Sequence, residues 1–143
     1  TGEGEGAGYT VNVPLAGGQG DGEYAGIFNQ ILRPILEQYA PELILVSAGF
    51  DGHERDPLGH MRLSGHGFGY LAQVILDAAQ ALGHGRVLFC LEGGYSLAGL
   101  TESIRAVLDA MRGARHQGGL AQAQAPAACL DQARTVANGR WNL

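Results

Sequence analysis

The chain has 143 residues, 45% of them hydrophobic, and a formal net charge of -5, which is enough apolar content for one folded domain and excludes an intrinsically disordered protein. All nine basic residues are arginines scattered among acidic ones, which excludes the basic stripe that a nucleic acid partner needs. Without a run of roughly 18 apolar residues, an export signal or enough cysteines for a disulfide framework, we expect a cytoplasmic protein with no membrane partner.

The first part of the chain predicts a strand, a helix and a second strand. The acidic, glycine-rich stretch 1–8 is expected to be a flexible connector cut from a longer protein. Alternating branched residues predict a strand over 9–13, and apolar residues at helical spacing predict a helix over 23–39 that Pro34 kinks or interrupts. The apolar run 43–46 predicts a parallel strand buried on both faces.

The second part continues this alternation. Charged and turn-forming residues predict a loop over 51–65, whose length is typical of functional loops. An amphipathic helix is predicted over 68–83, a buried strand that includes Cys90 over 87–91, and a further helix over 97–111. Strands and helices that alternate in this way favour an α/β fold with a parallel sheet.

We divide the chain into a folded part over 1–113 and a low-complexity tail over 114–143. The tail is expected to be mobile, and only 129–136 has the composition of a short helix. Trp141 either docks on the core or stays loose.

Each predicted parallel strand ends in small residues followed by one chemically capable side chain. Asp51 follows the first strand, and Tyr95 follows the second after Gly93 and Gly94. Because the carboxyl ends of parallel strands meet at one edge of a sheet, we expect this carboxylate and this phenol to lie together where open α/β folds bind ligands. A neutral phenol at such a place can stabilise an oxyanion; alternatively, the Tyr95 ring packs over the strand end.

The loop after Asp51 also contains His53 and Asp56, and oxygen and nitrogen ligands of these types bind hard or borderline cations. Alternatively, this is an exposed polar loop in which Asp56 caps a turn before Pro57 and His53 faces water. The glycine-rich segment 17–22 invites a dinucleotide-binding interpretation. Its spacing departs from G-x-G-x-x-G, however, and it places an acidic residue where a pyrophosphate would sit.

Four segments in this order and spacing carry a resemblance to a known family: GAGYTVNVPL at 6–15, LVSAGFDGH at 45–53, DPLG at 56–59 and LEGGYSL at 91–97. Together they resemble the C-terminal half of the zinc-dependent deacetylases, which include histone deacetylases, acetylpolyamine amidohydrolases and acetoin-utilisation proteins. The residues of these segments are more similar to those of class II and bacterial members than to those of class I. The resemblance implies an α/β fold of the three-layer arginase-deacetylase type, with flanking helices around a parallel sheet.

The resemblance also implies roles for single residues. Asp51 resembles a carboxylate ligand of Zn2+, and Tyr95 resembles the catalytic phenol that polarises the substrate carbonyl and stabilises the oxyanion. Tyr9 resembles a position near a structural monovalent cation. The predicted substrate tunnel has Pro57 and Leu58 at its rim and Gly93 and Gly94 in its wall.

The departures from the family pattern limit what this chain is expected to do. The tandem His pair and the Asp-x-His motif of the family lie upstream of the glycine loop, and this sequence does not contain them. Although Asp51-Gly52-His53 has Asp-x-His spacing, it aligns with another ligand strand, so we do not assign His53 as a ligand. One carboxylate does not retain zinc, and we expect the chain alone to be inactive.

The predicted function is therefore that of part of a zinc-dependent amide hydrolase, which deacetylates an acetylated protein or an acetylated small amine, such as a polyamine, to the amine and acetate. The alternative is a non-catalytic binding module on the same scaffold, against which the presence of both Asp51 and Tyr95 argues. We also expect an exposed sheet edge and an exposed apolar helix face, through which the chain would self-associate.

Overall fold

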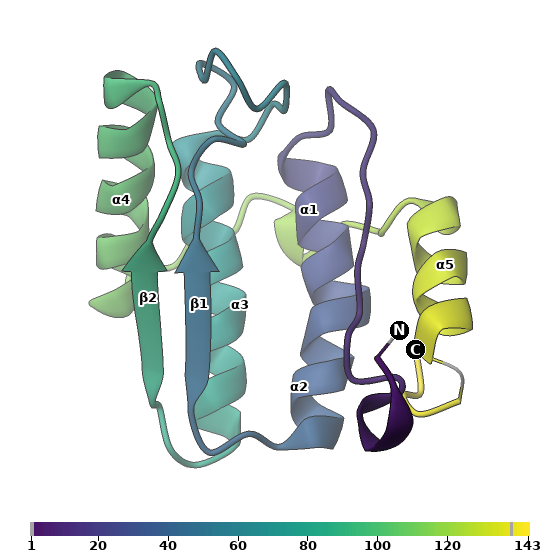
Figure 1. The fold of residues 1–143 in the computed structure, drawn as a ribbon. Coiled ribbons are helices and arrows are strands. Elements are labelled where there is room, and N and C mark those ends of the chain that lie inside the picture. Colours follow the sequence, from purple (N-terminus) through teal and green to yellow (C-terminus); the bar gives the residue numbers. More distant parts are fainter. Residues whose placement is uncertain (1, 138) are drawn as a thin grey trace.

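The computed structural model describes residues 2–137 and 139–143, and in it the chain forms a parallel sheet backed by helices (Figure 1). Residues 1 and 138, which fall in the predicted connector and tail, lie outside the described residues. Within the described part, the sheet consists of β1 (Ile44–Ala48) and β2 (Val87–Leu91), which pair from Ile44 opposite Val87 to Ala48 opposite Leu91. The predicted α/β fold with a parallel sheet is confirmed.

The helices follow the predicted order, and the two long ones begin at serine caps. Ser64 accepts the Gly67 N–H before α3, and Ser96 accepts the Gly99 N–H before α4. No helix in residues 2–137 and 139–143 combines the length and the apolar character needed to cross a bilayer. The helical elements are η1 (Gly4–Gly6), α1 (Asp21–Ile27), η2 (Phe28–Leu32), α2 (Arg33–Tyr39), α3 (Gly65–Ala81), α4 (Leu97–Met111), η3 (Leu120–Gln122) and α5 (Ala127–Ala137).

The interruption predicted at Pro34 takes the form of a π-helical turn. Proline lacks an N–H, and its ring collides with the carbonyl four residues earlier in a regular α-helix. The turn η2 widens the backbone just before this residue, and the Arg33 N–H bonds to the Phe28 carbonyl, five residues back. Helix α1, η2 and α2 therefore form one continuous helical rod (Figure 1).

The strand predicted over 9–13 is wrong. This segment forms no ladder and runs beside α1 and α2 instead of joining the sheet (Figure 1). Val11 and Val13 pack against the buried Ile27 and Ile31 of the helical rod. The alternation of apolar residues therefore serves one-sided packing of an extended segment on helices.

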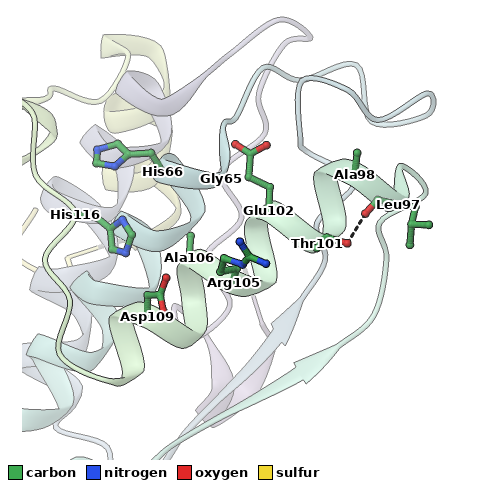
Figure 2. A pocket seen from close by; sticks show the side chains of 10 residues that line it. All are labelled: Gly65, His66, Leu97, Ala98, Thr101, Glu102, Arg105, Ala106, Asp109 and His116. Carbon is green, nitrogen blue, oxygen red and sulfur yellow. Dashed lines mark hydrogen bonds between the residues drawn. The ribbon is translucent and has the colours of Figure 1, made fainter.

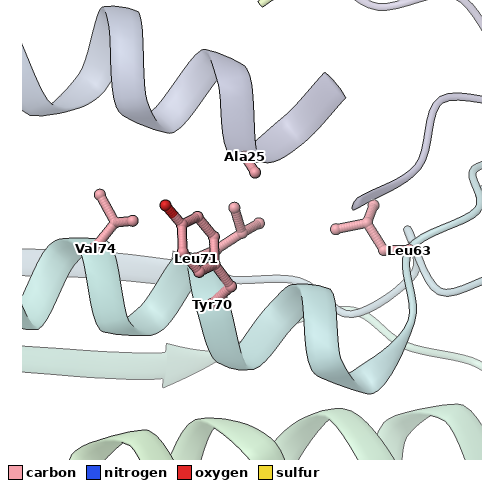
Figure 3. Close-up of a cluster of buried hydrophobic side chains, with 5 residues drawn as sticks. All are labelled: Ala25, Leu63, Tyr70, Leu71 and Val74. Carbon is pink, nitrogen blue, oxygen red and sulfur yellow. The ribbon is translucent and has the colours of Figure 1, made fainter. Parts of the chain in front are cut away.

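The main core lies between α1 and α3. Figure 3 shows Leu63, Tyr70 and Val74 gathered below Ala25, whose small side chain lets the two helices approach. Leu63 and Val74 are fully buried, and the Tyr70 hydroxyl donates a hydrogen bond of 2.9 Å to Asn29 Oδ1. This packing fixes α1 and α3 against each other.

One face of the sheet is covered and the other is bare in the described part of the chain. Helices α2, α3 and α4 pack on the face that carries Val46 and Phe89. On the opposite face, Leu45 and Leu88 are 66% and 53% exposed, and Cys90 is exposed as well. The predictions that the strands are buried on both faces and that Cys90 is buried are therefore wrong for this structure.

The described part of the tail packs on the body of the domain, where the sequence predicts a loose course. Arg115 pairs with Asp77 of α3 through two hydrogen bonds of 2.7 and 2.8 Å. Helix α5, which confirms the predicted short helix, buries Ala133 against the helical rod. The Trp141 Nε1–H donates to the Gly8 carbonyl at 2.8 Å, so the tail meets the start of the chain.

Truncation of Leu63 tests this core. The Leu63→Ala variant is expected to lose about 2–5 kcal/mol of unfolding free energy, because a fully buried leucine leaves a cavity. The matched variant Leu45→Ala removes a leucine that is 66% exposed and should change the free energy by less than about 0.5 kcal/mol. Urea denaturation of both variants measures the difference, and equal losses would contradict the burial pattern.

Candidate functional site

The backbone ladder continues past the ends of both strands. The Glu92 N–H donates to the Ala48 carbonyl at 3.0 Å, and the Phe50 N–H donates to the Gly93 carbonyl at 2.8 Å. These two bonds hold the residues before Asp51 alongside the residues before Tyr95. The structure thus brings the two strand ends together at one edge of the sheet, as the sequence predicts.

The carboxylate of Asp51 lies over this junction. A Cβ atom at Gly49 would come within 2.7 Å of Asp51 Oδ1, and a Cβ atom at Gly93 would come within 3.0 Å of the same oxygen. A side chain at Gly49 would displace this carboxylate, and one at Gly93 would crowd it. Asp51 is partly exposed, so it is accessible from the edge of the sheet.

Sequence reasoning missed Tyr24 of α1, whose phenol interacts electrostatically with this carboxylate. Burial raises the pKa of the Tyr24 phenol, and the negative charge of Asp51 raises it further. The Tyr24 phenol therefore keeps its proton at neutral pH. Its place in the helical pattern of α1 gives no signal of this interaction, because the two residues are 27 positions apart in sequence.

Tyr95 projects from a glycine turn after β2. Gly94 has a φ of +135°, a conformation that side chains disfavour, and a Cβ atom there would lie 2.9 Å from Leu100 and 3.1 Å from Phe50. The Tyr95 side chain is 62% exposed. The alternative in which its ring packs over the strand end is therefore not supported.

Asp56 fastens the loop after Asp51 to the backbone at Tyr95. Its Oδ1 accepts the N–H groups of Leu58 at 2.9 Å and Gly59 at 3.2 Å, which is the predicted turn cap. Its Oδ2 accepts the N–H groups of Tyr95 at 2.6 Å and Ser96 at 3.3 Å. Loss of solvent contact raises the pKa of Asp56, but the four backbone hydrogen bonds outweigh it and hold the pKa below its usual value.

The other predicted tunnel residues lie on the same two loops. Pro57 and Leu58 are exposed at the turn that Asp56 caps, and Leu58 is 61% exposed. Gly93 and Gly94 lie on the facing loop. The Asp56 hydrogen bonds thus join the predicted rim to the loop that carries the predicted wall. The roles of rim and wall in a substrate tunnel stay predictions.

His53 does not face water, so this part of the polar-loop alternative is wrong. The residue is 0% exposed, and its Nδ1 accepts the Arg55 N–H at 3.1 Å. The described residues contain no group of three side chains placed to hold a metal ion. Asp51 thus fits one ligand position, and these residues by themselves do not fit a complete zinc site.

In the glycine-rich segment 17–22, Gly20 and Asp21 make hydrogen bonds to other residues of the protein. The Gly20 N–H donates to Glu23 Oε2 at 2.9 Å, so a carboxylate already lies at the start of α1. Asp21 accepts hydrogen bonds from the Ser64 N–H at 2.8 Å and the Ser64 hydroxyl at 2.6 Å. This arrangement argues against a pyrophosphate site there.

A cleft of roughly 760 Å³ lies between α4 and the start of α3, and its Glu102 pairs with Arg55 of the loop after Asp51. Figure 2 shows its polar lining, in which Glu102, Arg105 and Asp109 project from α4 near His66 and His116. None of the predicted site residues lines it. The chemistry expected from the sequence therefore belongs to the open edge of the sheet and not to this cleft.

Comparisons with known proteins point to one family. The family described as "Histone deacetylase domain" matches residues 1–111. The chloroplastic histone deacetylase 10 of Oryza sativa subsp. japonica is 42% identical over 103 residues, which are 72% of this chain and 23% of that protein. The human polyamine deacetylase HDAC10 is 36% identical over 98% of this chain and 21% of its own length. The solved structure of the histone deacetylase Clr3 has a TM-score of 0.80 and 32% identity, and the match covers 94% of this chain and 22% of Clr3.

The chain thus spans less than a quarter of the length of each of these proteins.

Asp56 makes stability depend on pH. Because the folded state lowers its pKa, its contribution is fully present above the unfolded pKa of 3.8 and disappears as the pH falls through the folded value. Asp56→Asn should therefore reduce stability at pH 7 and flatten the loss seen on acidification. Denaturation at pH 7 and pH 3 measures this, with the exposed Asp131→Asn as the control. The same pH dependence in both variants would contradict the role of the four hydrogen bonds.

Proposed function

This chain belongs to the histone deacetylase family, and we propose that it works within a longer zinc-dependent hydrolase that removes the acetyl group from an acetylated lysine or polyamine. The products are the free amine and acetate. The observation that carries the proposal is the junction of the two strand ends, where the Phe50–Gly93 hydrogen bond and the Asp56 bonds hold the Asp51 and Tyr95 loops together.

Each side chain has a separate task in this proposal. Asp51 supplies one carboxylate ligand, and bound zinc would supply a Lewis acid and activate water. Tyr95 donates its phenolic hydrogen to the carbonyl oxygen of the substrate, and this donor is most effective when negative charge develops on that oxygen. The backbone hydrogen bond from Tyr95 to Asp56 fixes the main chain from which this phenol projects.

The names of the relatives support the proposed substrate class. One relative is named a histone deacetylase and another a polyamine deacetylase, so both names point to acetylated amines. Turnover of an acetyl-lysine peptide and of an N-acetylated polyamine, compared in the longer protein, would separate the two substrates.

The Tyr95→Phe variant of the longer protein tests the oxyanion role. Removal of one such donor is expected to lower kcat about 10²–10³-fold, with little change in KM, because the bond strengthens in the transition state. The control is Tyr39→Phe, which removes the hydroxyl of an exposed tyrosine at the end of α2. An unchanged rate for Tyr95→Phe would exclude the role and favour a non-catalytic binding module.

We further propose that these 143 residues alone neither retain zinc nor turn over substrate. Catalytic zinc sites use about three protein ligands, whereas the proposed site draws only Asp51 from this chain. Equilibrium dialysis should give much less than one zinc per chain, and an acetyl-lysine peptide should stay intact. Robust turnover by the chain alone would overturn this assignment.

A further inference from the structure

We propose that His53 is a positioning residue for the reaction, which wedges the Asp51 loop against the start of α4 and thereby fixes Tyr95 relative to Asp51. The inference rests on the proposed function. It concerns a residue that is neither a metal ligand nor in contact with substrate in that proposal.

The first argument is the burial of an imidazole within a charged loop. His53 is 0% exposed, although Glu54 and Arg55 beside it are exposed. The backbone N–H of His53 donates to the Phe50 carbonyl at 3.1 Å, and the backbone carbonyl of His53 accepts the Asp56 N–H at 2.8 Å. His53 thus joins the residue before Asp51 to the residue that clamps Tyr95.

The second argument is the contact with α4. A Cβ atom at Gly99 would lie 2.7 Å from His53 Nδ1 and 2.8 Å from its Cγ, so the ring rests directly on the helix backbone. The Gly99 N–H in turn donates to Ser96 Oγ at 3.2 Å, and Ser96 directly follows Tyr95. Movement of this ring would therefore release the helix turn to which Tyr95 is attached.

The third argument explains why the wedge is a histidine. Its Nδ1 accepts the Arg55 N–H, so in the neutral ring the proton is on Nε2. Nε2 lies 3.9 Å from Glu102 Oε2, too far for a hydrogen bond, and Glu102 pairs with Arg55 Nη2 at 3.2 Å instead. The imidazole thus combines the volume of a spacer with one acceptor for a backbone N–H that an apolar residue would leave unpaired.

A double-mutant cycle in the longer protein tests this role. His53→Ala should lower kcat by about 10²-fold with little change in KM, because a displacement of the catalytic group by about 1 Å has effects of this size. If His53 acts through Tyr95, the same substitution should have little further effect in the Tyr95→Phe background. Independent, multiplicative losses would overturn the proposal.

Two further variants separate positioning from a general loss of structure. His53→Asn retains a side-chain acceptor close to the position of Nδ1 and should recover part of the lost kcat. His84→Ala is the matched control, because His84 Nδ1 accepts the Arg86 N–H at 2.9 Å in the same geometry, at the opposite end of the sheet. His84→Ala should leave kcat unchanged, and an equal loss in both alanine variants would overturn the proposal.

Amide hydrogen exchange in this chain gives a readout that needs neither zinc nor turnover. His53→Ala should accelerate exchange of the Tyr95 and Ser96 amides, whose N–H groups donate hydrogen bonds to Asp56. His84→Ala should leave their exchange unchanged. Unchanged exchange would overturn the wedge even if the longer protein is an active deacetylase. Conversely, absence of deacetylase activity in the wild-type protein would overturn the proposed function, while accelerated exchange would still support the wedge.

Discussion

The candidate site depends on one carboxylate that accepts hydrogen bonds from two loops at once. Asp56 takes two N–H groups from its own turn and two from the backbone at Tyr95 and Ser96, 39 and 40 residues further along the chain. Bonds to an ionised acceptor are stronger than bonds between neutral groups, and the two distant donors lie at the start of α4, where the helix dipole also favours a negative charge. A single side chain can therefore set the relative position of the loops that carry Asp51 and Tyr95.

The same region contains a buried polar atom, Nε2 of His53, that lowers the stability of the fold. The His53 Nε2 is buried without a hydrogen-bond partner, and an unsatisfied buried group of this kind costs about 1–3 kcal/mol. Gly99, which carries no side chain, is also a weak helix former. Both choices are unfavourable for stability, and both become understandable if the close contact between ring and helix positions Tyr95.

Local patterns predicted much of this arrangement, and contacts between distant residues account for what they missed. The apolar runs before Asp51 and Tyr95 were sufficient to predict β1, β2 and their shared edge, because parallel strands leave little choice for their carboxyl ends. The alternation over 9–13 shows which side chains are buried but not whether a strand or a helix covers them. The burial of His53 depends on Gly99, 46 positions away, and the neighbouring charged residues predict the opposite.

The bare face of the sheet and the lone ligand lead to the same conclusion about how the chain works. Leu45 and Leu88 form an apolar surface on the sheet whose edge carries Asp51, and nothing in the described residues covers that surface. Pairing of two copies through this face would bury the leucines, but the only proposed ligand it would add is a second Asp51. Two carboxylates do not supply the nitrogen ligands expected from the family resemblance. Further residues of different sequence would both cover the sheet and complete the metal site. This requirement supports the proposal that the chain works within a longer protein.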